Sequence, residues 1–145
     1  MKIRILSFIL FLSFMGCGPM NKKPEDSSAN SPSSLGSSGL TRFSKDNQFL
    51  VYVESASKPT WGENIYRFRF KYSKNLAKTS AQTITVQYDM PTMPSMGTSE
   101  EIATYNPEDD FFTTTLFFTM SGRWQITLKL EDGALQDEYT FEISF

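Results

Sequence analysis

Apolar and polar residues alternate strictly in several short segments of the chain, and this period of two constrains the fold more than any other feature. In the segment IYRFRFKY (residues 65–72), Tyr66, Phe68, Phe70 and Tyr72 fall on one face and basic residues separate them. Successive side chains of a β-strand point to opposite faces, so the pattern predicts a strand with one buried face. The same alternation recurs in TITVQYDM (83–90), RWQITLKLE (123–131) and EYTFEISF (138–145).

Three further segments complete the expected set of strands. QFLVYVE (48–54) predicts a first strand, DFFTTTLFFTM (110–120) is apolar on both faces and predicts a central one, and a short strand is expected near residues 102–105. Asp132-Gly133 separates the last two alternating segments, which is typical of a hairpin turn. No segment has a convincing helical stripe, so residues 42–145 are expected to form an all-β domain of about seven antiparallel strands. An immunoglobulin-like β-sandwich is favoured, and a small β-barrel is the alternative.

The N-terminus has the pattern of a bacterial export signal. Lys2 and Arg4 precede an apolar run over residues 5–14, which is too short to span a bilayer. The run leads into Phe14-Met15-Gly16-Cys17, which resembles the lipobox of bacterial lipoproteins. We therefore expect residues 1–16 to be a signal peptide and Cys17, the only cysteine, to carry the lipid anchor, palmitate included. Gly18 at the next position is similar to the sorting signal for the periplasmic face of the outer membrane.

The segment that follows is rich in Ser, Pro, Asn and Gly, and it predicts a disordered tether over residues 17–41. Removal of the signal peptide would leave 12 basic and 16 acidic residues, a net charge of −4. A nucleic-acid partner is not expected, because binding to phosphates needs a basic face. The expected partners are the membrane, through the lipid, and another protein of the envelope.

Four motifs in order resemble a family of bacterial envelope domains. They are KPTWGEN (58–64), MPTMPSMG (90–97), DDFFTTTLFFTMSGRW (109–124) and the final YTFEI (139–143). Together they are similar to the FixH/YtkA-like family. The resemblance implies an immunoglobulin-like fold and a link to copper handling, since FixH is a membrane protein associated with cytochrome oxidase assembly and a copper pump. This chain departs from FixH in its expected lipid anchor, and from many members in having no histidine.

The methionines are the candidate ligands for a metal. Thioether sulfur is a soft donor suited to Cu(I), and Met90, Met93, Met96 and Met120 are the candidates within the predicted domain. Prolines between the first three favour a polyproline II segment, in which a spacing of three puts the side chains on one face but about 9 Å apart. Such a segment would have to bend near residues 95–97, or use Met120, to hold one ion.

Structural roles compete with metal binding at each position. Met90 and Met120 continue the inward phase of their strands and are expected in the core. For Met93 and Met96 three roles are equally consistent with the sequence: metal ligation, an adaptable contact surface and loop packing. Two functions follow: a lipid-anchored envelope domain that binds Cu(I), or a metal-free interaction module.

The interaction module would use the Met-Pro loop, with Trp61, Pro91 and Pro94, as its contact surface. The acidic run Glu108-Asp109-Asp110 is expected to be a solvated turn rather than a site for a hard cation. Without histidine or a free cysteine, an enzyme is not expected.

Overall fold

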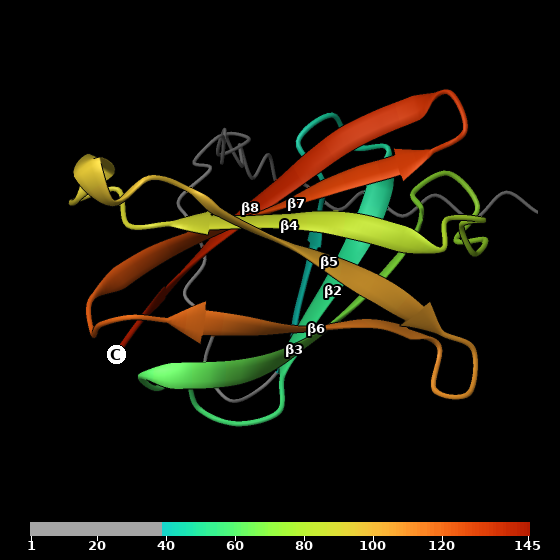
Figure 1. Cartoon of the computed structure of the whole chain (residues 1–145). Helices are drawn as coiled ribbons and strands as arrows, with labels where there is room; N and C mark the ends of the chain where they lie inside the picture. Colours follow the sequence, from blue (N-terminus) through green and yellow to red (C-terminus); the bar gives the residue numbers. More distant parts are fainter. Residues whose placement is uncertain (1–38) are drawn as a thin grey trace, which may run out of the picture. The chain divides into compact units, whose positions relative to one another are not determined.

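The computed structural model describes residues 39–145, which form eight β-strands and one short 3-10 helix (Figure 1). The expected signal peptide, Cys17 and most of the expected tether lie outside the described residues. The elements in chain order are β1 (Leu40–Phe43), β2 (Phe49–Ser55), β3 (Gly62–Tyr72), β4 (Thr83–Asp89), η1 (Pro94–Met96), β5 (Ser99–Asn106), β6 (Phe111–Phe118), β7 (Arg123–Asp132) and β8 (Leu135–Ser144). The all-β prediction is confirmed. β1 is an additional strand, and it contains Leu40 and Thr41, so the predicted tether boundary at residue 41 is wrong by two residues.

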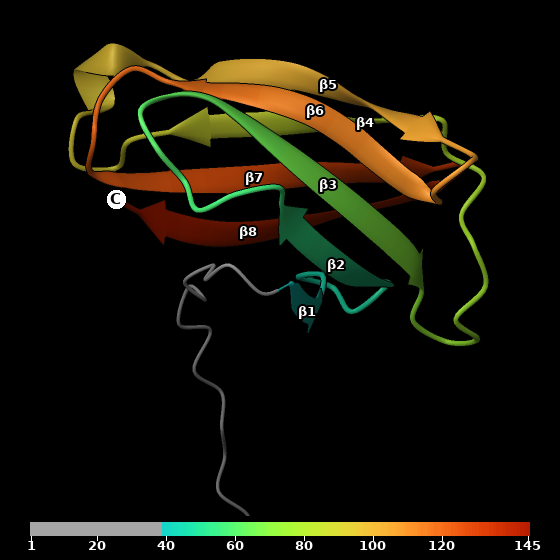
Figure 2. The same ribbon diagram turned by 90° about the horizontal axis from the view of Figure 1, so that it is seen from below.

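The strands form one antiparallel sheet in the order β1-β2-β3-β6-β5-β4-β7-β8. The sheet folds over so that its two halves face each other, as Figure 2 shows for β3 and the β7–β8 hairpin. Tyr66 on β3 packs against Phe141 on β8 with ring centroids 6.3 Å apart. The result is a sandwich whose halves stay joined through β5 and β6, intermediate between the two architectures expected from sequence.

Polar contacts join the opposite side of the sandwich, where β8 meets the turn between β1 and β2. The backbone N–H of Lys45 donates to the carbonyl of Glu138 at 2.8 Å. The carboxylate of Asp137 accepts the backbone N–H groups of Asp46 and Gln48, at 2.9 and 3.1 Å, and the hydroxyl of Ser44. Partial burial would raise the pKa of Asp137, but these hydrogen bonds outweigh burial and the net pKa is lowered. The fold is therefore nearly closed on both sides.

The core contains the inward face of every long strand, as the alternation predicts. Its largest fully buried side chains are Tyr66, Phe49, Phe68, Phe118, Phe141, Leu116, Ile126, Leu128, Leu130, Ile143, Val51 and Val53. The prediction that residues 110–120 form a central strand is confirmed, because β6 pairs with β3 on one side and with β5 on the other. On its outward face, Phe111 is covered by the guanidinium groups of Arg67 and Arg69, 4.1 and 4.2 Å from its ring centroid, while Phe117 is 49% exposed. Stacked cations, and not a second apolar layer, shield this face at Phe111.

A second carboxylate, that of Asp132 at the end of β7, fixes the connection between β3 and β4. Asp132 is buried and accepts the hydroxyl of Tyr72 at 2.6 Å, the backbone N–H of Ser80 at 2.8 Å and the hydroxyl of Ser80. Burial disfavours the charged form, but the hydrogen bonds from Ser80 and Tyr72 outweigh it and lower the pKa of Asp132 below its ordinary value of 3.8. The ionised carboxylate is thus a structural element of the fold.

We expect Asp132→Asn to lower the free energy of unfolding at pH 7 by about 1–3 kcal/mol, because the N–H₂ group of the amide would face part-buried donors that now bond a carboxylate oxygen. The stabilisation by Asp132 is fully present above pH 3.8 and is lost as pH falls through the lower folded pKa. The difference in the free energy of unfolding between wild type and variant should therefore decrease below about pH 3.8, as measured by urea titrations followed by circular dichroism. Glu131→Gln, at an exposed neighbour, is the control. An equal gap at pH 7 and pH 3 would contradict the assignment.

Candidate functional site

The Met-Pro loop consists of two consecutive tight turns. The carbonyl of Met90 accepts the backbone N–H of Met93 at 2.8 Å, and the carbonyl of Met93 accepts that of Met96 at 3.0 Å. Pro91 and Pro94 occupy the second position of each turn, which proline favours because its φ is fixed near −65°. Each turn brings its first and fourth α-carbons within about 7 Å. The predicted polyproline II stripe is therefore wrong, and successive methionines lie closer together than it implied.

Gly97 ends this pair of turns. Its N–H donates to the carbonyl of Pro94 at 3.3 Å, and its φ of 73° lies in the left-handed region that favours glycine. The chain then enters β5 at Ser99. Glycine at this position lets the loop turn back to the sheet within two residues.

Met90 lies in the core, as its strand phase predicts. It is 4% exposed and directly follows β4. A Cβ atom at Gly122 would lie only 2.6 Å from the Met90 methyl carbon, so this side chain packs on the bare backbone of the turn between β6 and β7. Gly122 has a φ of 142°, which also disfavours a larger residue. Apart from the glycine itself, no sequence pattern indicates this contact.

Met120 lies in the same β6–β7 turn and is partly buried against the core. Two tryptophans hold the turn. The indole N–H of Trp124 donates to the carbonyl of Met120 at 3.1 Å, and that of Trp61 donates to the carbonyl of Thr119 at 3.1 Å. Trp124 is buried, whereas Trp61 is 70% exposed, as its position in a Pro-Thr-Trp-Gly turn suggested. The two rings thus fix Met120 at the end of the domain that carries the Met-Pro loop.

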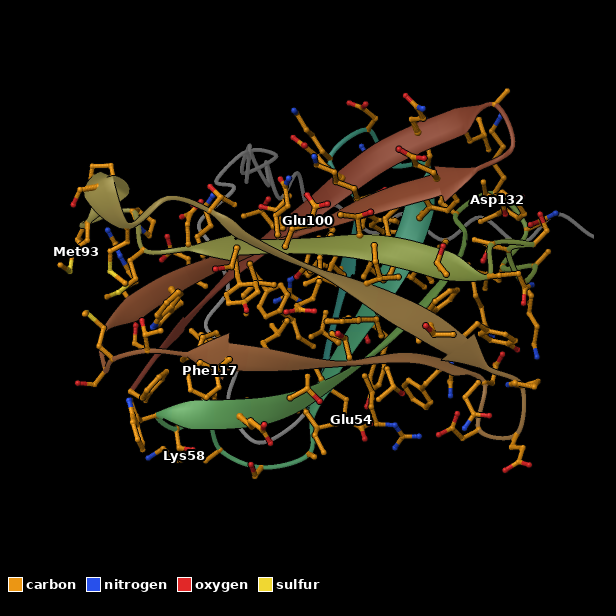
Figure 3. All side chains as sticks on the ribbon, in the orientation of Figure 1. Glu54, Lys58, Met93, Glu100, Phe117 and Asp132 are labelled. Carbon is orange, nitrogen blue, oxygen red and sulfur yellow. The ribbon has the colours of Figure 1, made fainter. Side chains whose placement is uncertain are left out.

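Met93 and Met96 are the accessible methionines, 39% and 42% exposed. In Figure 3 the side chain of Met93 points away from the sheet at one end of the domain, and the yellow sulfur atoms all lie at that end. These sulfurs belong to the four methionines of residues 39–145. The structure therefore brings the four predicted residues to one end, two of them facing solvent and two packed beneath.

The acidic run after β5 is part of an ion-pair network. Asp109 contacts Arg67 at 2.8 Å, and Asp110 contacts Lys78 at 2.8 Å and Arg69 at 3.5 Å. The hydrogen bond from Lys78, assisted by Tyr105, lowers the pKa of Asp110. Within residues 39–145, no group of three or more His, Cys, Asp or Glu side chains is placed to hold a metal ion. These carboxylates are arranged for structure.

A sequence profile described as YtkA-like matches residues 43–129, more than half of the chain. The chain belongs to the YtkA-like family. The YtkA-like match contains Trp61 and all four methionines of the described domain, and it ends within β7. No curated protein and no solved structure shows significant similarity to the chain. In the part of the chain that the structure describes, no helix has the length and apolar character needed to cross a bilayer.

Alanine substitutions should separate the buried methionines from the exposed ones. We expect Met90→Ala to lower the free energy of unfolding by about 2–5 kcal/mol, because it removes a core side chain and leaves a cavity over Gly122. Met93→Ala and Met96→Ala should each change it by less than about 0.5 kcal/mol. Urea denaturation measures all three. A large loss at Met93 or Met96 would show that the loop packs into the core and is not free to act as a site.

Proposed function

We propose that this YtkA-like protein is a lipid-anchored domain of the bacterial envelope that binds Cu(I) at the Met-Pro loop. Met93 and Met96 are its exposed ligands, and Met90 and Met120 are the neighbouring thioethers. The observation that carries the proposal is the pair of consecutive turns, which replaces an extended stripe by a compact arrangement of methionines. The family resemblance, through FixH, makes assistance to a copper-dependent envelope complex the expected context.

The donor chemistry fits this ion. Thioether sulfur is soft and neutral, and it favours Cu(I) over Zn²⁺, Mg²⁺ or Ca²⁺. A thioether has no proton to lose, unlike a thiol or an imidazolium, so its affinity should vary little with pH. In an oxidising compartment thioethers also avoid the disulfide chemistry of thiols. The four methionines would supply binding alone, without a group for acid–base catalysis.

The position of Met90 defines how the site would be filled. Its methyl group lies against Gly122 in the core, whereas Met93 and Met96 face solvent. The two exposed thioethers can therefore receive an ion without disturbing the core. A third sulfur, from Met120 or Met90, would require a change of side-chain rotamer at the surface of the core.

The direct test is a Cu(I) titration of the purified chain against a chromophoric chelator. We expect a Kd of about 1 µM or tighter, because two or more soft donors hold the ion. The double variant Met93→Leu/Met96→Leu should weaken binding at least tenfold while leaving circular dichroism unchanged. Ser95→Ala, which keeps both sulfurs in the same turn, is the matched control. Binding weaker than about 1 µM, or equal binding by the double variant, would rule the proposal out.

A metal-free contact surface is the second candidate function. Met93, Met96 and Trp61 are large exposed apolar side chains, and methionine adapts its shape to different partners. The indole of Trp61 contacts the β6–β7 turn, on which Met90 packs at the start of the Met-Pro loop. Pro91 and Pro94, both exposed, would keep the loop rigid. This candidate predicts that the chain shows no measurable Cu(I) affinity but that Met93→Leu/Met96→Leu leaves partner binding nearly intact, since leucine preserves the apolar surface.

Lipidation of Cys17 can be tested in cells. Cys17 lies outside the described residues, and its acylation rests on the lipobox-like sequence before it. We expect labelled palmitate to enter the wild-type chain and the chain to fractionate with outer membranes. Cys17→Ser should abolish labelling, because serine has no thiol for the acylation. Ser27→Ala, in the Ser-rich segment beyond the lipobox, is the control. Equal membrane fractionation of the Cys17→Ser variant would contradict lipid anchoring.

A further inference from the structure

Strands β5 and β6 are neighbours in the sheet for only a short distance. Their pairing is confined to Thr104↔Thr113, Tyr105↔Phe112 and Asn106↔Phe111. Beyond that point β5 follows β4 and β6 follows β3, and the two strands diverge in Figure 1. Residues 114–118 of β6 are therefore paired on one side only. The sheet has an open edge in its interior, next to the end that carries the Met-Pro loop.

The backbone of β6 shows which groups face this opening. The N–H of Phe117 donates to the hydroxyl of Tyr88 on β4, across the opening, in a long bond of 3.5 Å. Alternate residues of an antiparallel strand direct their N–H and C=O groups to the same side, so those of Thr115 also face the opening. Thr114, Leu116 and Phe118 direct theirs to β3. An incoming strand would thus find free donors and acceptors at Thr115 and a weakly held donor at Phe117.

The side chains of β6 do not protect this edge. Natural edge strands are commonly blunted by charges, proline or bulges. Residues 113–118 (TTTLFF) contain neither a charge nor a proline, and they are β-branched or apolar. The facing strand is different, because Glu100 and Glu101 of β5 are both exposed. Charged side chains that disfavour strand pairing therefore lie on the β5 side of the opening and not on β6.

The outer surface beside the open edge is apolar with acidic neighbours. Phe117 on β6, Ile65 on β3 and Ile102 on β5 are 49%, 48% and 52% exposed. Glu63 is exposed and pairs directly opposite Phe117. Figure 3 shows Phe117 on β6 and Glu100 on the far side of the opening. A complementary strand would present basic side chains to this outer face, with their methylene stems over Phe117 and Ile65 and their charges near the glutamates, and apolar side chains to the opposite face.

We propose that the free edge of β6 binds an extended segment of a partner protein by strand addition, and that the segment alternates apolar with basic residues. Main-chain hydrogen bonds at Thr115 and Phe117 would supply affinity, while basic side chains on the outer face, near Glu63 and Glu100, and apolar ones on the opposite face would supply specificity. A second copy of this chain is a poor occupant. Pairing of β6 with β6 would bring Glu63, Glu100 and Glu101 of both copies together, and like charges oppose such pairing.

The test uses fluorescence anisotropy of a blocked, labelled octapeptide of alternating valine and lysine, titrated with the purified full chain. A peptide of alternating valine and glutamate is its control. We expect the lysine peptide to bind at least about tenfold more tightly, since Glu63 and Glu100 lie on the outer face beside the edge. Hydrogen exchange read by mass spectrometry should show new protection within residues 111–118. Equal binding of the two peptides, or protection confined to β1 or β8, would overturn the proposal.

Variants separate strand addition from simple surface attraction. Thr115→Pro removes an N–H that faces the opening and keeps the donors to β3, so it should reduce binding at least about tenfold. Thr115→Val keeps the N–H and should bind as wild type. If Thr115→Pro does not fold, a lysine peptide that is N-methylated at alternate residues decides the question, because it keeps the charge but loses main-chain donors. Unchanged binding by Thr115→Pro or by the N-methylated peptide, or a dimer in size-exclusion chromatography that Thr115→Pro dissociates, would contradict the proposal.

Discussion

The packing of Phe118 at one end of the sandwich is the contact on which the rest of that end depends. Its buried ring lies 5.0 Å from the ring of Trp124, 5.6 Å from Phe145, 5.9 Å from Tyr88 and 6.3 Å from Tyr66. These partners come from β7, the C-terminus, β4 and β3, so one aromatic cluster holds both halves of the sheet together. Aromatic side chains bury large areas and favour such edge-to-face and tilted contacts. The Met-Pro loop begins at Met90, two residues after Tyr88, and the β6–β7 turn begins directly after Phe118.

Local alternation predicted most of the fold, and long-range contacts supplied what it missed. The inward face of residues 65–72 could be predicted, because the alternation within one strand is enough to identify its buried side. The two turns at Met90 and Met93 could not be predicted, since proline suits the second position of a turn as well as it suits polyproline II. The burial of Phe111 beside the exposure of Phe117 was also hidden, because it depends on the cations that β3 places over one ring.

The carboxylates that close the fold illustrate the same limit. Asp137 is bound by groups of residues 44–48, and Asp132 by Tyr72 and Ser80, all far away in sequence. From sequence alone Asp132 is only the first residue of an Asp-Gly turn. Its ionised form becomes structural only when the connection between β3 and β4 places a hydroxyl and a backbone N–H of Ser80 against it. Sequence patterns assign faces, whereas such pairings require the assembled topology.

The free edge of β6 and the methionine end are linked by the same strand. β6 ends at Phe118, and the next residues, Thr119 and Met120, carry the carbonyls that Trp61 and Trp124 hold. A segment added along β6 would therefore end beside Met120 and the exposed ring of Trp61. The proposed binding of Cu(I) and the proposed strand addition would use different groups, side-chain sulfur in one case and backbone N–H and C=O in the other. Because the groups differ but the location is shared, a bound partner would be positioned to receive or deliver an ion at the Met-Pro loop.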